Sequence, residues 1–77
     1  MEKFSEPRPI QKLRIDLGMT LRDAAKMSGV NHSMIQKIET HAVINPSIDV
    51  CHSLAYAYGL DLDILWYFLF PIPMAEK

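Results

Sequence analysis

The feature that most constrains the fold of this chain is a three-residue break, Gly29-Val30-Asn31, between two stretches with helical periodicity. Glycine readily adopts the left-handed backbone conformation that ends many helices. Asn31 can then cap the next helix with its side-chain oxygen. Two helices joined by so short a turn, the first ending at glycine, are typical of a helix-turn-helix. The sequence therefore predicts this motif over about residues 21–40.

The remaining glycines and the prolines indicate further helix ends. Gly18 and Gly59 each follow a stretch with apolar residues at helical spacing, and all five prolines lie outside such stretches. Proline is tolerated in the first turn of a helix and disrupts its interior. No run of alternating apolar and polar residues indicates a strand. We expect an all-α chain, with helices at about residues 9–17, 21–28, 32–40, 48–58 and 62–70, the last four capped by Thr20, Asn31, Ser47 and Asp61.

The length of 77 residues allows one small domain. We expect an N-terminal arm at 1–8, a helix-turn-helix domain at 9–70 and a C-terminal tail at 71–77. No apolar run reaches the roughly 18 residues that span a bilayer, and the first residues lack the apolar segment of a signal peptide. We therefore expect a cytoplasmic protein with no membrane partner. Its small core, which a single cysteine cannot cross-link, gains stability from a partner subunit.

The sequence offers no arrangement suited to catalysis or metal binding. His32, His41 and His52 lie on different expected elements, and no C-x-x-C or H-x-x-x-H pair is present. A Gly-rich phosphate loop is also missing. Cys51 lies on the apolar face of its helix, which suits a small core residue better than a nucleophile. We expect no enzyme activity, no metal, no cofactor and no small-molecule ligand.

Within the motif, the small and apolar residues have mechanical roles. Ala25 is expected to face the third helix where the two axes cross, and Val30, Ile35 and Ile38 to fill the core beneath that helix. With Gly29 in the turn, the stretch LGMTLRDAAKMSGVNHSMIQKIE resembles the Xre/Cro family of phage and bacterial repressor DNA-binding domains. The resemblance runs without a gap from about residue 10 to residue 65, and NPSIDVCHSLAYAYGLDLDIL follows the family's fourth and fifth helices.

The resemblance implies a compact, five-helix, lambda-repressor-like fold in a bacterial or phage-encoded protein. It also implies a structural pair between Arg14 and Glu39, which stand at the family's positions for such a pair. Two departures are visible in the core: Ala24 replaces the usual Leu, and Ser28 replaces a large apolar residue, so Met27 is a candidate gap filler. The loop at 41–45 carries no Lys or Arg, although the family commonly has Gly, Lys or Arg there against phosphates.

The resemblance also assigns the DNA contacts, because the family inserts the N-terminal part of its third helix into the major groove. The expected base-reading residues are His32, Ser33, Lys37 and, as a secondary reader, Gln36. The expected phosphate contacts are Thr20, Leu21, Arg22, Asn31 and Thr40, with Arg8, Lys12 and Lys26 as weaker candidates. Residues 8–38 hold six Lys and Arg against two Asp, which fits an anion-facing surface. The alternative is an ordinary solvated helix face.

The C-terminal run from Ile64 to Met74 has more large apolar residues than one small core can cover. Apolar patches of this kind commonly mark protein interfaces. We expect a dimer interface formed by Trp66, Tyr67, Phe68, Phe70 and Ile72, with Val43 and Ile44 at its edge. The alternative folds this run back over its own subunit as an extra core layer.

The sequence therefore predicts a transcriptional regulator, repressor-like or Cro-like, that binds double-stranded DNA at an inverted repeat as a homodimer. The alternative is a protein-interaction module on the same fold, antirepressor-like or antitoxin-like, with weak or no DNA binding. The 39–76 segment favours this alternative, because it holds five acidic residues and no Lys or Arg.

Overall fold

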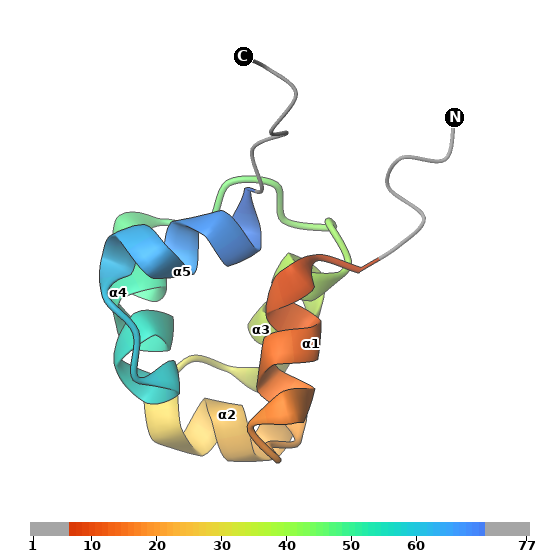
Figure 1. Ribbon diagram of the computed structural model, residues 1–77. Coiled ribbons are helices and arrows are strands. Elements are labelled where there is room, and N and C mark those ends of the chain that lie inside the picture. The colour runs from red at the N-terminus through yellow and green to blue at the C-terminus, as the bar shows by residue number, and fades with distance from the viewer. Residues whose placement is uncertain (1–6, 71–77) are drawn as a thin grey trace.

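The computed structural model describes residues 7–70, which form five helices and no strand (Figure 1). The helices are α1 (Pro9–Asp16), α2 (Leu21–Ser28), α3 (His32–Glu39), α4 (Ile48–Tyr58) and α5 (Leu62–Leu69). Each expected helix is present and ends within one residue of its expected position. The predicted all-α, five-helix fold is confirmed.

Side-chain caps begin three of these helices. The Thr20 hydroxyl accepts a hydrogen bond from the Asp23 N–H at 3.0 Å, and the Asp23 carboxylate accepts one from the Thr20 N–H at 3.0 Å. The Ser47 hydroxyl accepts from the Val50 N–H at 3.2 Å at the start of α4. Each cap satisfies a backbone donor that has no partner inside its helix. Asp61 stands at the N-cap position of α5, as expected, but its side chain makes no capping bond.

The turn between α2 and α3 has the expected geometry. Gly29 ends α2 with φ of 78°, and its N–H donates to the Ala25 carbonyl at 2.8 Å. The Asn31 side-chain oxygen accepts from the Ser33 N–H at 2.7 Å and caps α3. The chain therefore changes direction within the three residues between α2 and α3. The polar face of α3 is not covered by α2.

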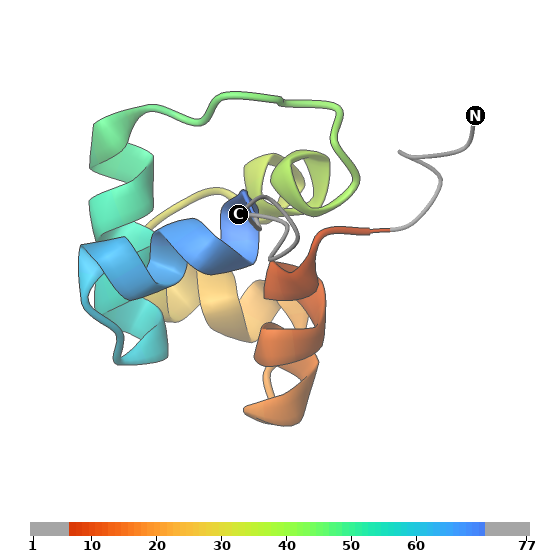
Figure 2. The same cartoon turned by 45° about the horizontal axis from the view of Figure 1, so that its top comes forward.

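The core lies where the five helices meet, as two views of the ribbon show (Figures 1 and 2). Helices α4 and α5 pack side by side, and α1 and α3 lie across from them. Each of α1, α3, α4 and α5 contributes one or two large side chains that are almost completely buried: Ile10, Ile35, Ile38, Leu54, Leu65 and Leu69. Cys51 is also buried, in agreement with its expected place in the core.

Two details of the packing differ from expectation. In α2, Ala24 is completely buried and Ala25 is half-buried against the core, as a core position for each would require. Met27 is exposed and therefore fills no gap beneath Ala24. Leu17, expected on the inner stripe of the first helix, is also exposed, because α1 ends at Asp16 and the chain turns away there.

Candidate nucleic-acid interface

The outward face of α3 is polar, and its inward face packs in the core. Ser33, Gln36 and Lys37 are exposed, whereas Ile35 and Ile38 are almost completely buried. His32 is half-buried at the first position of the helix. Because the two isoleucines fix the rotation of α3 about its axis, the three exposed side chains point away from the molecule together.

Four of the expected phosphate-contacting residues lie at the beginnings of α2 and α3, and the fifth, Thr40, lies at the end of α3. Thr20, Arg22 and Asn31 are exposed, whereas Leu21 is half-buried and packs against the core. The side-chain oxygen of Asn31 is occupied by its cap, which leaves the two amide N–H groups of that side chain to donate. Thr40 is exposed at the end of α3, where its hydroxyl donates to the Gln36 carbonyl at 2.9 Å.

Asp23 limits what the start of α2 can offer to an anion. Its hydrogen bonds with the Thr20 backbone and hydroxyl lower the pKa of Asp23, so the carboxylate stays ionised. It also occupies the backbone N–H of Thr20. A phosphate at this helix start must therefore rely on the remaining backbone donors and on the Arg22 guanidinium.

The cations of the 8–38 segment divide into exposed and buried groups. Arg22, Lys26 and Lys37 are exposed, and Lys12 is exposed in an ion pair with Asp16 at 3.0 Å. Arg8 is only 3 % exposed, so its assignment as a phosphate contact is wrong. Its burial also places residue 8, which the sequence assigned to the N-terminal arm, within the packed domain.

Arg14 is the second buried arginine, and it joins α1 to the C-terminal end of α3. Its Nε donates to Glu39 Oε2 at 2.7 Å, its Nη2 to Glu39 Oε1 at 3.1 Å, and its Nη1 to the Met19 carbonyl at 2.8 Å. The hydrogen bonds to Glu39 raise the pKa of Arg14. Glu39 is only 1 % exposed. The pair therefore joins α1 to the end of α3, in agreement with a structural role.

The C-terminal helix divides its apolar residues between the core and the surface. Leu65 and Leu69 are buried, and Phe68 and Phe70 are half-buried against the core. The expectation that Phe68 and Phe70 are surplus to the core is therefore wrong in part. Trp66 and Tyr67 remain on the surface, 45 % and 55 % exposed. Ile72, also assigned to a dimer interface, lies outside the described residues.

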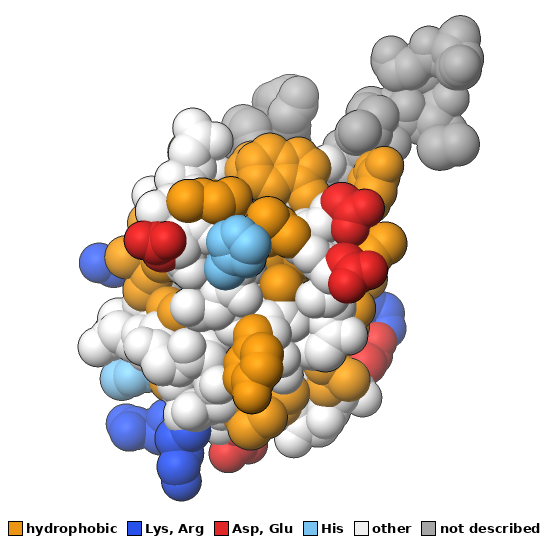
Figure 3. Space-filling view, turned by 90° about the vertical axis from the view of Figure 1, so that its left-hand side faces the viewer, with side chains coloured by type: hydrophobic (Ala, Val, Ile, Leu, Met, Phe, Trp, Pro, Cys, Tyr) orange, Lys and Arg blue, Asp and Glu red, His pale blue; other side chains and the backbone are white. Residues whose placement is uncertain are grey.

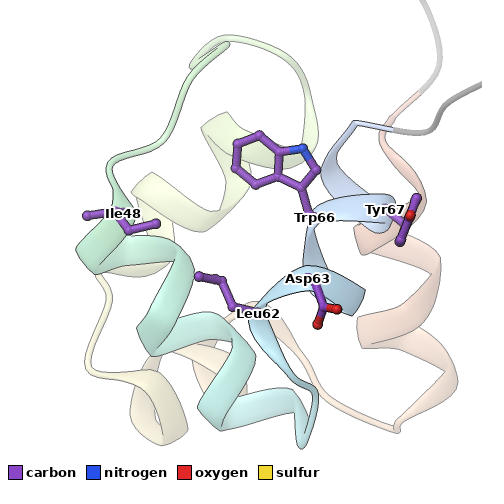
Figure 4. Close-up of a pocket in the computed structure, with 5 residues that line it drawn as sticks. All are labelled: Ile48, Leu62, Asp63, Trp66 and Tyr67. Carbon is purple, nitrogen blue, oxygen red and sulfur yellow. The ribbon is translucent and has the colours of Figure 1, made fainter.

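A groove of about 390 Å³ separates α5 from the start of α4. It is lined by Ile48, Leu62, Asp63, Trp66 and Tyr67 (Figure 4). The Trp66 ring extends over the space between the two helices, and Ile48 comes from the first turn of α4. Figure 3 shows this side of the molecule, where acidic side chains flank a hydrophobic patch and Lys and Arg gather mainly at the lower left edge.

Among the described residues, no other group of side chains suggests catalysis or metal binding. These residues hold no cluster of His, Cys, Asp and Glu that could bind a metal ion. Within the same range, no helix is long and apolar enough to cross a membrane. Burial raises the pKa of the Cys51 thiol, which keeps this cysteine protonated and unreactive.

A family model described as helix-turn-helix, of the Xre/Cro kind, matches residues 10–65. Comparisons with curated proteins and with solved structures give no match. The matched range holds α2, α3 and α4 in full, α1 apart from Pro9, and the first half of α5. Since the match covers most of the chain, the protein belongs to the Xre/Cro-type helix-turn-helix family of DNA-binding regulators.

Proposed function

We propose that this protein is a sequence-specific regulator that inserts the N-terminal part of α3 into the major groove of its operator. The observation that carries the proposal is the pairing of an exposed polar face, Ser33, Gln36 and Lys37, with a core face that fixes its direction. Helices of this family read DNA in that way. The regulator then acts by occupying its site and blocking or recruiting polymerase.

The exposed side chains suit different base edges. The Lys37 ammonium can donate to guanine O6 and N7, and the Gln36 amide can pair with the N6 and N7 atoms of adenine. The Ser33 hydroxyl donates and accepts, so it discriminates less. His32, which is half-buried, contributes at the edge of the contact.

Phosphate contacts come from the positions around this face. The starts of α2 and α3, at Leu21 and Asn31, present backbone N–H groups, and Arg22 adds a cation. Thr20 and Thr40 are exposed at the start of α2 and at the end of α3. The 41–45 loop has no Lys or Arg. We therefore expect a shallow salt dependence, with about two to four phosphates neutralised per subunit.

The second part of the proposal is a homodimer on an inverted repeat, because two recognition helices must be about 34 Å apart to read adjacent turns of the groove. Trp66 and Tyr67 are the exposed members of the expected interface, and they lie on the groove between α5 and α4. A second copy would cover these rings and give the small core additional buried surface.

One observation favours the alternative, a protein-interaction module. Asp63 lines the groove, and residues 39–76 contain no Lys or Arg to pair with it. A symmetric contact would bring like charges together, whereas a different protein with basic residues beside an apolar anchor would not. Retardation of random-sequence DNA at low salt, followed by release as salt rises, separates the two functions. The absence of any retardation would favour the second.

The recognition helix is tested by Lys37→Ala, with Arg22→Ala as its matched control. An operator is first selected from random DNA, and each variant is then titrated against that operator and against a scrambled sequence. Lys37→Ala should lose about 1–3 kcal/mol on the operator and relax the preference for it. Arg22→Ala should weaken both DNAs about equally. Unchanged specificity in Lys37→Ala would exclude it as a base reader.

The dimer is tested by sedimentation of the wild type and of Trp66→Glu/Tyr67→Glu at micromolar concentration. These two side chains are preferred because Phe68 and Phe70 also support the core. The variant should stay folded, become monomeric and lose affinity for the full repeat more than for one half-site. A monomeric wild type would end the self-association proposal.

A further inference from the structure

We infer that Arg8 and Phe70 form a clasp that fixes the loop between α3 and α4 (residues 40–47) in the shape that contacts DNA. Arg8 thus acts as a positioning residue and does not contact the nucleic acid. The inference rests on the proposed function, because the loop follows α3 directly and reaches the phosphate backbone only if α3 lies in the major groove.

The contacts of Arg8 converge on this loop. Its Nη2 donates to the Ile44 carbonyl at 2.7 Å, and its Nε donates to His41 Nδ1 at 3.3 Å. Its backbone N–H donates to the Glu39 carbonyl, the last of α3, at 2.8 Å. The guanidinium carbon lies 5.0 Å from the centre of the Phe70 ring. One residue therefore links the end of α3, two positions of the loop and the end of α5.

The clasp is formed by residues outside the family match. The matched range is 10–65, so Arg8 precedes it and Phe70 follows it. Figure 2 shows the start of α1 beside the end of α5. Arg8, before α1, and Phe70, after α5, are therefore close together. Arg8 and Phe70 thus join the two ends of the matched range to the loop inside it.

The electrostatics of Arg8 indicate a role beyond packing. Its side chain has no carboxylate partner among the described residues, and its buried Nη1 has no hydrogen-bond partner there. Burial lowers the pKa of Arg8. What arginine adds is a rigid fork of donors, which can hold positions 41 and 44 at the same time.

The loop needs such support. It has no Lys or Arg between residues 40 and 47, and the N–H groups of His41 and Val43 already donate to the Ile38 and Lys37 carbonyls, so its attraction for phosphate depends on the direction of its other backbone N–H groups. His41 has φ of 69°, a left-handed conformation that its contacts help to hold. The Val43 N–H also donates back to the Lys37 carbonyl at 3.0 Å. Loss of the Arg8 contacts would release the loop and make its ordering part of the binding reaction.

The test is Arg8→Met, compared with Lys12→Met, which removes an exposed cation from α1 and so reports the effect of a lost charge that makes no contact with the loop. Binding to the selected operator and to scrambled DNA is measured over a range of salt concentrations. Arg8→Met should weaken both DNAs by about tenfold, because ordering of the loop now opposes binding. The specificity ratio and the salt slope should not change. If Arg8 contacted a phosphate, the slope would fall by about 0.9, and that result would overturn the clasp.

Arg8→Lys separates the charge of Arg8 from its geometry. The ammonium keeps the positive charge but cannot donate along the two directions of the guanidinium fork. We expect Arg8→Lys to bind DNA as weakly as Arg8→Met. Full rescue by lysine would show that only the charge matters, and the positioning role would be wrong.

Hydrogen exchange tests the clasp without DNA. Amide exchange in the 40–47 loop should be faster in Arg8→Met than in the wild type and unchanged in Lys12→Met. If Arg8→Met does not fold, Phe70→Leu replaces it as a milder change to the clasp. Amide exchange in the 40–47 loop should again be faster than in the wild type. Unchanged loop exchange would overturn the clasp. A wild type that binds no DNA would instead overturn the proposed function and leave the exchange result to decide on the clasp.

Discussion

At its N-terminal end α3 begins in an exposed turn, where Gly29 supplies the left-handed conformation and Asn31 supplies a single capping bond. At its C-terminal end the Glu39 carboxylate is buried in a two-bond contact with Arg14, and the Glu39 carbonyl accepts from Arg8. The hydrogen bonds at the first end come from neighbours within the turn, and those at the second end come from residues 25 and 31 positions earlier in the chain. Val30 and Met34 pack the first end against the core, but only the second end is joined by polar bonds to a distant part of the chain.

The two ends also differ in the free energy that depends on them. A helix cap contributes about 1 kcal/mol, and its donors return to water when it is lost. Loss of one partner from a buried ion pair leaves an uncompensated charge and costs about 3–5 kcal/mol. Variants at the C-terminal end should therefore strongly lower the free energy of unfolding. Variants at the N-terminal end should mainly alter the angle and dynamics of α3.

The largest effect is expected for Glu39→Gln. The amide keeps the shape of the carboxylate but leaves the buried Arg14 guanidinium without a counter-charge, so the variant should lose about 3–5 kcal/mol of stability in urea denaturation. This is most of the stability of a small domain.

Arg14→Met/Glu39→Met is the control for that prediction. Because both charges are removed together, it should be much less destabilised than Glu39→Gln. If Glu39→Gln lost less than 1 kcal/mol, the C-terminal end would be no more firmly held than the N-terminal one.

The next effect is expected at the turn. Gly29→Val should cost roughly 1–3 kcal/mol, because a β-branched residue resists a φ of 78°. A Cβ at this position meets no atom within 4 Å, so the loss comes from backbone strain and not from a clash. Gly29→Asn is the matched control, since asparagine tolerates the left-handed region better. Equal losses for Val and Asn would mean that contacts made by the side chain, and not φ, set the cost.

These two ends show which parts of the structure could be predicted from the sequence. The turn and the caps depend on residues a few positions apart, so glycine, asparagine and threonine identify them directly. The Arg14–Glu39 pair spans 25 positions and was expected only through the family resemblance. The burial of Arg8 had no such signal, because it requires a loop and the end of α5 to meet in space.

The C-terminal helix shows the same limit of sequence-based prediction. The excess of apolar residues predicted an exposed surface, and Trp66 and Tyr67 provide it. Phe68 and Phe70 differ because the helix turns by about 100° per residue, which brings neighbours of one run to the core and to solvent in turn. Which of them face inward depends on how α5 packs on α1 and α4, and that packing is set by the whole core.

A smaller effect is expected for Phe70→Leu. Leucine retains the apolar contact but removes the aromatic face beneath the Arg8 guanidinium, so the variant should lose about 1 kcal/mol. Trp66→Leu is the control. It removes the contact between the Trp66 and Phe70 rings, whose centres are 4.7 Å apart, and keeps Arg8 over Phe70. Urea denaturation of both variants separates the two contacts, and a Phe70→Leu variant as stable as the wild type would leave Arg8 held by its hydrogen bonds alone.

The smallest effect is expected for Tyr58→Phe, close to the charges of Arg14 and Glu39 at the firmly held end. The Tyr58 hydroxyl is buried without a hydrogen-bond partner among the described residues, so its removal should change stability by less than about 1 kcal/mol at neutral pH.

Burial, with the nearby Glu39 charge, raises the pKa of Tyr58 to about 12. The unfolded chain ionises this tyrosine near pH 10, so the wild type should lose stability as the pH rises from about 10 to 12. Tyr58→Phe should lack that component, whereas Tyr56→Phe, at an exposed position of the same helix, should follow the wild type. If Tyr58→Phe lost more than 1 kcal/mol at neutral pH, the hydroxyl would have a partner that supports the Arg14–Glu39 pair.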